Sequence, residues 1–423
     1  MDKAVLVGAP NKDVPISLAD EHLRELGQLT DTAGGQVVGT VRQRLDHPHP
    51  RYYVGEGKAH ELRDAVAETQ ADLVIFDEEL SPAQGKNLED LIGVRVMDRS
   101  ELILDIFATR ARSRESRMQV ELAQLEYLLP RLKRMWSHLS RIRGGIGLRG
   151  PGETQLETDR RMIGEKIADL KGRLRDVARA REVQRRSRAG QFRASLVGYT
   201  NAGKSSLLRT LSGDTELFVE DRLFATLDSA TRSVELGDGY SALVTDTVGF
   251  IRKLPHHLVA SFRSTLEEAR EADLLLHVVD ASHPDWQEQF DVVGGVLEEL
   301  ELAERPQILV FNKVDRLTHA EEEVLRARVR AFEASPAVFV SALEPASLGA
   351  LKETLKARMR QRLPCVEVEM SAGDGELLAW LYREGEVLGR ADHGDTIGIT
   401  ARIPDRMLGQ LRQREGIRIR EVA

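Results

Sequence analysis

The sequence predicts an α/β protein built from four successive parts. Short apolar runs that fit buried strands alternate with amphipathic stretches over 1–108 and again over 193–363. Between them, over 109–192, apolar residues recur at intervals of four and three, which is the spacing of a coiled-coil seam. The last part, 364–423, begins with strand-like alternation. We therefore expect an N-terminal α/β domain, a two-helix coiled-coil hairpin arm, a mostly parallel doubly wound sheet and a small C-terminal α/β domain.

The first region should form a small parallel sheet. Apolar residues at 5–7 and 37–41 fit strands, and 18–29 fits a helix between them. A Gly-Glu-Gly-Lys turn at 55–58 precedes a further helix and could grip a phosphate. No complete phosphate-binding fingerprint accompanies it, so a tight strand–helix connection is the simpler interpretation. A second nucleotide site there stays an open hypothesis.

The second region is predicted to be a helical hairpin. Its two apolar seams are separated by a segment, 144–152, that is too rich in glycine to be helical and long enough to reverse the chain. A plain structural arm, or part of a helical core, would show the same seams. The seam residues are Met118, Leu122, Leu125, Leu129, Leu132, Trp136 and Leu139 in the first helix and Ile163, Ile167, Leu170, Leu174 and Val177 in the second.

This hairpin region is basic within an acidic protein. The whole chain has 60 Lys+Arg and 68 Asp+Glu, whereas 110–193 holds 22 basic and 10 acidic side chains. A charged helix face is ordinarily only solvated, but an excess of this size along both helices favours a phosphate-backbone partner. No spacing typical of a helix-turn-helix or zinc finger is visible, so RNA is favoured over DNA.

The third region starts with a phosphate-binding motif. An apolar strand at 194–197 leads into 198–205, which fits GxxxxGKS, and an amphipathic helix follows. In such a loop, backbone N–H groups surround phosphate oxygens, Lys204 contacts the β- and γ-phosphates and the Ser205 hydroxyl binds Mg²⁺. The expected loop residues are Gly198, Tyr199, Thr200, Asn201, Ala202, Gly203, Lys204 and Ser205.

Three later motifs indicate guanine rather than adenine. A strand at 242–244 ends in DxxG, where a carboxylate can hold the metal and a glycine N–H can approach the γ-phosphate. The strand at 307–311 ends in Asn-Lys-Val-Asp, similar to the guanine-recognition motif of regulatory GTPases, in which Asp315 would accept from the base. The strand at 337–340 ends in Ser-Ala, expected beside guanine O6. We therefore expect a Ras-like P-loop GTPase domain. The residues are Asp246, Thr247, Val248, Gly249, Asn312, Lys313, Val314, Asp315, Ser341, Ala342 and Leu343.

A segment between the P-loop and DxxG is expected to be the mobile loop that Mg²⁺ and the γ-phosphate order. Thr226 is the preferred second metal hydroxyl, with Ser229 and Thr231 as nearby alternatives. The predicted catalytic residues are Lys204, Thr226 and Gly249, and the metal ligands are Ser205 and Thr226. The nucleotide-binding residues of this segment are Phe224, Ala225, Thr226, Leu227 and Asp228.

Phe250 follows DxxG at the position where Ras-like switches carry a glutamine that orients the attacking water. Phenylalanine cannot orient water, so hydrolysis by the isolated protein should be slow, and activation by a partner is expected. A core residue that packs under the loop is the compatible structural interpretation.

The remaining sequence features say more about where in the cell the protein works than about its chemistry. The region 364–423 carries no catalytic pattern, so we expect a structural or partner-contact module. A single cysteine, Cys365, excludes an intramolecular disulfide and suits a reducing cytosol. No stretch approaches the ~18 apolar residues of a membrane span. We expect a soluble, cytoplasmic protein.

These features together resemble the HflX family of ribosome-associated GTPases. The resemblance covers most of the chain. It is most specific in the glycine loop and its continuation at 144–161, in Leu-Phe-Ala-Thr-Leu-Asp at 223–228 and in Asp-Thr-Val-Gly-Phe at 246–250. The segment Tyr-Tyr-Val-Gly-Glu-Gly-Lys at 52–58 is also similar. One departure is Ser229, where the family usually has proline after the aspartate, which bears on the stiffness of the loop and not on its metal ligand.

The resemblance implies a function. It implies that Ser205 and Thr226 coordinate Mg²⁺, that the arm binds the large (50S) ribosomal subunit and that the glycine tip reaches ribosomal RNA near the peptidyl transferase centre. The protein would hydrolyse GTP and split or rescue stalled or stress-inactivated ribosomes. Two alternatives stay open: an RNA-remodelling protein with peripheral nucleotide turnover, and a ribosome-assembly GTPase that shares every motif.

Overall fold

The computed structural model of the chain describes residues 1–135, 151–186, 191–217, 219–254, 268–332, 335–414 and 416–422. The chain folds into two compact units. The first unit contains 1–181, 219–228 and the segment that begins at Val248. The second unit contains 182–218, 229–247 and 268–423. Two segments of the region that carries the nucleotide motifs therefore fold with the N-terminal unit.

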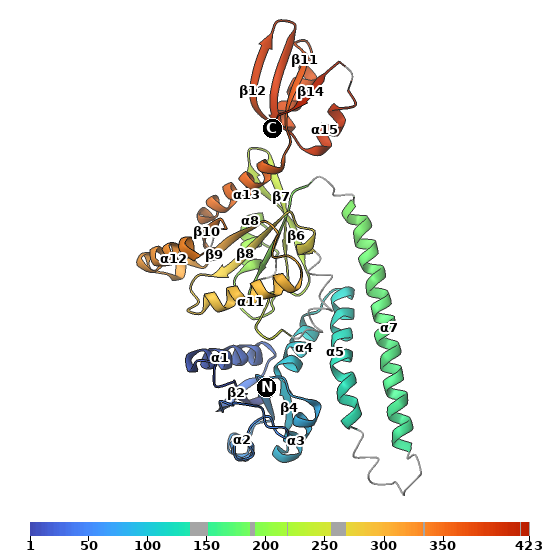
Figure 1. Ribbon diagram of the computed structural model, residues 1–423, viewed down its shortest axis with the longest axis vertical. Helices are drawn as coiled ribbons and strands as arrows, with labels where there is room; N and C mark the ends of the chain where they lie inside the picture. Colours follow the sequence, from blue (N-terminus) through green and yellow to red (C-terminus); the bar gives the residue numbers. More distant parts are fainter. Residues whose placement is uncertain are drawn as a thin grey trace. The chain divides into compact units, whose positions relative to one another are not determined.

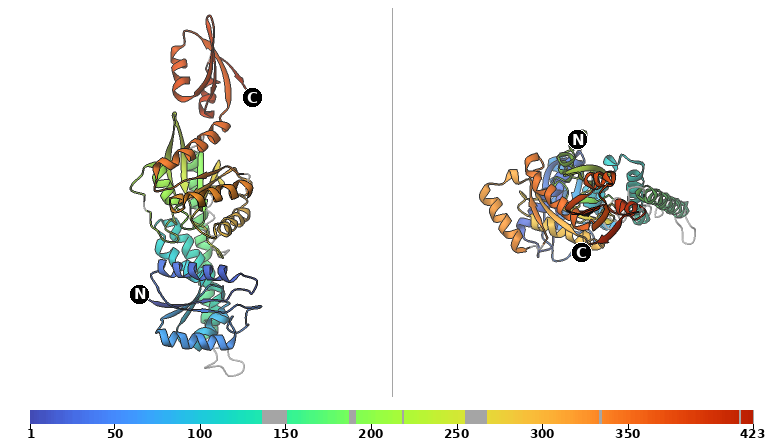
Figure 2. Two further views of the ribbon diagram at one scale, coloured as in Figure 1. Left: turned by 90° about the vertical axis from the view of Figure 1, so that its left-hand side faces the viewer. Right: turned by 90° about the horizontal axis from the view of Figure 1, so that it is seen from above.

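The first unit begins with a parallel four-stranded sheet in the order β2-β1-β3-β4. Helices α1 and α4 lie on one face of the sheet, and α2 and α3 lie on the other (Figures 1 and 2). This confirms the parallel sheet predicted for the N-terminal region. The elements are β1 (Lys3–Gly8), α1 (Ile16–Thr32), β2 (Gln36–Arg42), α2 (Glu56–Thr69), β3 (Leu73–Phe76), α3 (Pro82–Ile92), β4 (Arg95–Asp98) and α4 (Arg99–Arg110).

The Gly-Glu-Gly-Lys turn lies at the start of α2, as predicted, but its connection to the preceding strand is not tight. β2 ends at Arg42, and the chain between it and α2 forms bridges of its own, such as His49 with Tyr53. The N–H of Gly55 donates to Gln43 Oε1 over 2.9 Å. The turn is therefore part of an ordered loop that a short sequence motif could not reveal.

Two long helices, α5 (Arg114–Met135) and α7 (Pro151–Arg186), run antiparallel and side by side (Figure 1). The predicted seams meet, and an ion pair of 2.7 Å between Lys171 and Glu126 joins the two helices. The helical hairpin is thus confirmed. The residues in contact are Met118, Leu122 and Leu125 from α5 and Ile167, Leu170, Leu174 and Val177 from α7.

The predicted tip requires one correction. Residues 136–150, which include Trp136, Leu139 and most of the glycine loop, lie outside the described residues. Pro151 and Gly152, which we placed in the tip, belong to α7. Proline is compatible with the first turn of a helix because the N–H that it lacks would have no partner there.

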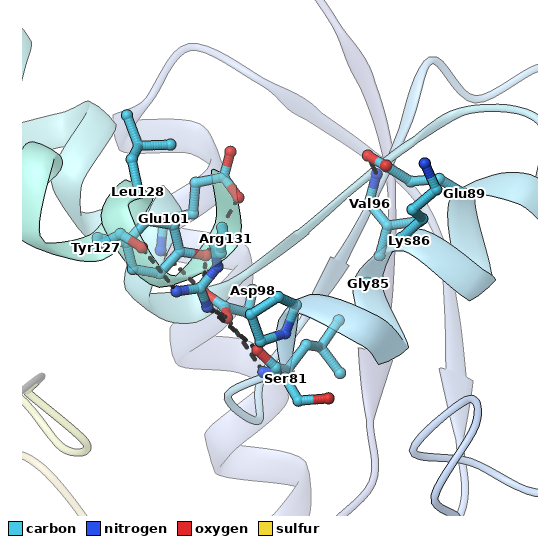
Figure 3. Close-up of a pocket in the computed structure, with 12 residues that line it drawn as sticks. Ser81, Gly85, Lys86, Glu89, Val96, Asp98, Glu101, Tyr127, Leu128 and Arg131 are labelled. Carbon is cyan, nitrogen blue, oxygen red and sulfur yellow. Dashed lines mark hydrogen bonds and ion pairs between the residues drawn. The ribbon is translucent and has the colours of Figure 1, made fainter. Parts of the chain in front are cut away.

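A cavity of about 410 Å³ lies where α5 meets the N-terminal sheet (Figure 3). Arg131 of α5 stacks over Tyr127, with 3.4 Å from its guanidinium carbon to the ring centroid. It also donates to Asp98 Oδ2 over 3.2 Å, and the Tyr127 hydroxyl donates to Asp98 Oδ1 over 3.1 Å. Asp98 ends β4 and its side chain also caps α4. These contacts fix the C-terminal half of α5 to the sheet.

The second unit contains a mixed six-stranded sheet in the order β10-β9-β8-β5-β7-β6, in which only the pairing of β6 with β7 is antiparallel. The mostly parallel sheet was predicted. The elements are β5 (Arg193–Gly198), α8 (Lys204–Ser212), β6 (Ala230–Gly237), β7 (Tyr240–Asp246), β8 (Leu274–Asp280), α11 (Trp286–Glu299), β9 (Gln307–Asn312), α12 (His319–Phe332), β10 (Ala337–Phe339) and α13 (Gly349–Arg362).

The C-terminal part has a separate antiparallel sheet in the order β12-β13-β11-β14. The sequence did not predict β12, because its residues from Leu388 to His393 are polar or exposed and lack an apolar alternation. The elements are β11 (Cys365–Ser371), α14 (Gly375–Glu384), β12 (Glu386–His393), β13 (Thr396–Arg402), α15 (Asp405–Leu411) and β14 (Arg418–Glu421). None of the helices in the described ranges combines the length and apolar character that a membrane span requires.

The apolar seam between α5 and α7 can be tested by substitution. Replacing Leu170, which is 3% exposed, with alanine should lower the opening free energy of α5 and α7 by about 2–5 kcal/mol, because it removes buried apolar contact. Met162→Ala on the same helix, at a site 60% exposed, should change it by about 0.5 kcal/mol or less. Native-state hydrogen exchange measures both. Equal effects of the two substitutions would contradict the packing of Leu170 between the helices.

Candidate guanine-nucleotide site

The P-loop between β5 and α8 has a backbone that only glycine fits at two points. Gly203 has φ of 94° and directly precedes α8, and a Cβ there would lie 2.2 Å from Asn312 Nδ2. A Cβ on Gly198 would lie 2.2 Å from the carbonyl oxygen of Val278. Both distances are far inside van der Waals contact, so the glycines let the loop pass close to β8 and β9.

Lys204 is held inside this loop. Its Nζ donates to the carbonyl oxygens of Gly198, over 3.0 Å, and Tyr199, over 2.9 Å. Burial lowers the pKa of Lys204 to about 8, although the carboxylate of Asp246 opposes that shift. A phosphate bound beside the buried amine would raise this pKa again, because it favours the charged form.

Ser205, in the first turn of α8, meets Asp246 at the carboxyl end of β7. β5 pairs with β7, with Leu196 opposite Asp246, and the Ser205 hydroxyl donates to Asp246 Oδ2 over 2.5 Å. Thr247 is anchored separately, since its hydroxyl donates to the carbonyl oxygen of Leu196 over 2.6 Å. A hydroxyl and a carboxylate beside a P-loop are the oxygen donors that Mg²⁺ prefers. The donor set fits that ion.

Asn312 joins three of the predicted motifs. It is 1% exposed, and its Nδ2 donates to the carbonyl oxygen of Ala202 in the P-loop over 2.9 Å. Its Oδ1 accepts from the N–H of Ala342 over the same distance. The Thr210 hydroxyl of α8 donates to the carbonyl oxygen of Ala342 over 2.6 Å. The asparagine of the guanine motif is thus a structural link between all three loops.

The rest of the guanine motif is arranged around this link. Lys313, with φ of 65°, donates through Nζ to the carbonyl oxygen of Asn201 and to Asp280 Oδ2, each over 2.7 Å. Asp315 Oδ1 accepts from the Ser341 hydroxyl over 2.6 Å. The structure therefore brings the predicted residues of the P-loop, Asn-Lys-Val-Asp and Ser-Ala together. Leu343, at the end of the last motif, is 71% exposed.

Two residues near the loop were not predicted. Asp280 ends β8 and pairs with Lys313, and its position at a strand end was a signal that the sequence offered. His277 lies in β8, is 2% exposed and stacks on Phe290 with 4.7 Å between ring centroids. Burial first, and then the charge of Lys204, lower the pKa of His277 to about 3, so it is neutral at physiological pH. Nothing in the sequence distinguished it from a core residue.

The predicted switch residues 224–228 belong to the first unit, where they pack on α4 and the start of α5. Phe224 is 1% exposed, and its ring meets Phe107 edge-on with 4.6 Å between centroids. Asp228 Oδ2 accepts from the N–H groups of Arg112 and Ser113, each over 3.1 Å. Leu227 is buried, whereas Ala225 and Thr226 are half-buried.

The alternatives to Thr226 lie in the second unit. The hydroxyl of Thr231 shares a hydrogen bond of 2.9 Å with that of Thr245 in the β6–β7 pair, so this side chain is engaged in the sheet. Ser229 directly precedes β6.

The segment after DxxG also belongs to the first unit, where it meets a buried carboxylate. Arg252 donates to both oxygens of Asp77 over 3.0 Å each, and Lys253 Nζ lies 2.9 Å from Asp77 Oδ2. Arg99 of α4 donates to Asp77 Oδ1 over 2.9 Å. Burial alone would raise the pKa of Asp77, but these three cations lower it well below its usual range. Phe250 is 1% exposed, which agrees with its interpretation as a core residue.

Comparison with known proteins decides the family. The chain matches the family models described as GTP-binding GTPase N-terminal over 20–108, GTP-binding GTPase Middle Region over 110–188 and 50S ribosome-binding GTPase over 193–313. It is 42% identical to GTPase HflX of Magnetococcus marinus over 427 residues, which cover 99% of this chain and 97% of that protein. It is 46% identical to GTPase HflX of Escherichia coli strain K12 over 366 residues, covering 86% and 85%. The chain belongs to the HflX family.

Membership in the HflX family agrees with the geometry of the second unit. The chain is a P-loop GTPase. Its second unit brings together the buried P-loop lysine and the predicted guanine motif, as expected for such an enzyme. The resemblance seen in the sequence is confirmed. The roles of individual residues in metal binding and catalysis remain predictions.

Asn312→Ala should weaken GDP binding by at least about tenfold, because it leaves the N–H of Ala342 and the carbonyl of Ala202 buried without their partner, at about 1–3 kcal/mol each. Displacement of a fluorescent GDP measures the affinity. Asn87→Ala removes an exposed amide that donates to the carbonyl of Arg51 and should leave GDP affinity unchanged. Unaltered affinity in Asn312→Ala would refute the linking role.

Nucleotide affinity should fall as pH rises through the pKa of Lys204. The unliganded lysine has a pKa of about 8, while bound phosphates favour its charged form, so binding takes up a proton above pH 8. The affinity should then fall by up to about tenfold per pH unit. Lys204→Arg stays charged and should lose this part of the dependence. Superimposable pH profiles for the two proteins would contradict the prediction.

Proposed function

We propose that this HflX-family GTPase is a GTP-driven switch that binds the large (50S) ribosomal subunit through its basic hairpin, 110–193. The hairpin is the observation that carries the proposal. Its two helices bury their apolar seams against each other, and charged side chains of α7 remain exposed: Arg161 is 72% exposed and Arg179 is 79% exposed. A basic and exposed helix face suits the phosphates of structured RNA. The description of the matching family as 50S ribosome-binding supports this partner.

Magnesium is the cofactor that the donor set suits. We propose that Ser205 and Thr226 supply its hydroxyl ligands and that Asp246, which already accepts from Ser205, orients the metal shell. The ion would neutralise charge that develops on the phosphates. Both hydroxyl ligands follow from the pattern shared with P-loop GTPases.

The chemistry is transfer of the γ-phosphoryl group of GTP to water, which yields GDP and phosphate. Lys204 stabilises negative charge on the phosphates, the N–H of Gly249 contacts the γ-phosphate, and Asp315 selects guanine through the base N–H groups. Asn312 holds the three loops together through the hydrogen bonds of its side chain. Since these steps depend on positioning, a loop held in the wrong place would slow hydrolysis without changing any catalytic group.

Phe250 gives the switch its dependence on a partner. The side chain is buried and carries no group that could orient water. Basal hydrolysis is therefore slow, and the large subunit accelerates it. We propose that the GTP-bound protein splits or rescues stalled or stress-inactivated ribosomes in the cytoplasm and that hydrolysis releases it.

The test is GTP hydrolysis by the purified protein alone, with isolated large subunits and with protein-free ribosomal RNA at matched concentration. Strong stimulation by subunits and weak stimulation by RNA is the expected result. Equal stimulation by bare RNA would favour an RNA-remodelling protein instead. Stimulation by immature particles in preference to mature subunits would favour a ribosome-assembly GTPase.

Charge reversal on the hairpin should separate binding from basal turnover. Arg161→Glu with Arg173→Glu changes two exposed side chains of α7 and should weaken large-subunit binding by at least about tenfold, most strongly at low salt. Basal hydrolysis should not change. Lys12→Glu with Arg63→Glu reverses two similarly exposed, ion-paired residues of the N-terminal region and serves as the control. An equal loss in both double variants would show a general charge effect.

A further inference from the structure

The first helix of the hairpin has an incomplete cap of its own. Ser113 precedes α5, and its hydroxyl accepts from the N–H of Ser116 over 3.0 Å. In a full capping box, the side chain at the third helical position also accepts from the N–H of the capping residue. Helix α3 has that reciprocal pair, formed by Ser81 and Gln84. In α5 the third position is Ser116, whose hydroxyl donates back to the carbonyl oxygen of Ser113 over 3.1 Å.

Asp228 supplies the missing acceptor from outside the helix. Its Oδ2 accepts from the N–H of Ser113, and also from that of Arg112, each over 3.1 Å. A carboxylate at a helix N-terminus is further stabilised by the helix dipole. Burial raises the pKa of Asp228, but hydrogen bonds from Ser113 and Ser116 and from the two backbone groups outweigh that effect and lower it. The carboxylate is therefore charged at neutral pH.

Two neighbours hold the same segment on the same junction. The ring of Phe224 packs on Phe107 of α4, and Glu220 pairs with Arg110 at the end of α4. Phe224 has φ of 54°, a left-handed backbone that a bulky residue adopts only when its surroundings impose it. Thus the loop from Glu220 to Asp228 is attached at three points to the end of α4 and to the turn that leads into the hairpin.

We propose that Asp228 is a positioning residue that transmits the nucleotide state from Thr226 to the first helix of the hairpin. The inference rests on the proposed function, in which Thr226 binds the metal together with GTP. Two residues of chain span at most about 7 Å, so Thr226 cannot move far unless Asp228 leaves Ser113 or carries the start of α5 with it. A movement of Thr226 beyond this reach on nucleotide exchange would alter the cap of α5, and the coupling is reciprocal.

A second attachment of α5 gives this transmission a structural consequence. α5 is attached to the N-terminal sheet near its other end, where Arg131 and Tyr127 contact Asp98. A change at Ser113 therefore acts on a helix that is held at a second point and that packs along α7 through its seam. A loosened cap would free the start of the helix, whereas an intact cap would keep it fixed.

Hydrogen exchange in the full-length protein tests the inference without ribosomes. Amides 112–118 are followed with GDP and with a non-hydrolysable GTP analogue, after the affinity of each variant for both nucleotides has been measured. The wild type should show different exchange in the two states. Asp228→Ala should exchange about fivefold faster at these amides, as expected for a lost cap, and should be equal in both states.

Matched variants distinguish coupling from local stability. Asp228→Asn keeps an acceptor oxygen and should recover most of the difference between nucleotides. Ser81→Ala removes a comparable cap from α3 and should raise exchange there while the difference at 112–118 persists. An Asp228→Ala protein that retains the full difference would overturn the inference, and so would a wild type with identical exchange in both states. Failure of ribosome binding alone would contradict only the proposed function.

Discussion

The buried carboxylate of Asp77 is the interaction on which the arrangement of the first unit depends. Two of the three cations around it, Arg252 and Lys253, come from the segment directly after DxxG, and Arg99 completes the set. Removing one partner of such a buried pair costs about 3–5 kcal/mol because the remaining charge has no compensation. The segment after DxxG therefore lies at the carboxyl end of β3, the end at which many parallel sheets bind ligands.

The segments that carry the nucleotide motifs are divided between the two units. The loops predicted to hold the phosphates and the base, linked through Asn312, fold in the second unit. The segments expected to respond to the γ-phosphate, around Phe224 and Phe250, fold with the first unit and with the helix that begins the hairpin. A ligand can shift such a system only through different interactions in its two states. Under the proposed function, GTP and GDP differ in the contacts that they offer to those segments, and the hairpin would respond to that difference.

Sequence reasoning reached the fold class, the P-loop, the guanine motif and the hairpin seam because each depends on local spacing. The strands that end at Asp246 and Asn312 are short apolar runs, and the Leu122 and Leu170 seams follow a fixed period. It missed β12, whose exposed residues carry no periodic signal, and it placed Pro151 in the tip. Most of all, it could not place Asp228 against Ser113 or Arg252 against Asp77, since these pairs are more than a hundred residues apart in the chain. Such contacts follow from topology and not from any local pattern.

The central claim is that the nucleotide state controls binding to the large ribosomal subunit. The most direct measurement is the affinity of the full-length protein for purified large subunits, determined at one fixed salt concentration with saturating GDP and with a non-hydrolysable GTP analogue. A switch requires differential affinity, and a coupling of about 1–3 kcal/mol corresponds to a difference of about five- to 150-fold. We predict tighter binding with the GTP analogue, within that range. Equal affinity in the two states would contradict the account, even if the protein hydrolyses GTP and binds ribosomes.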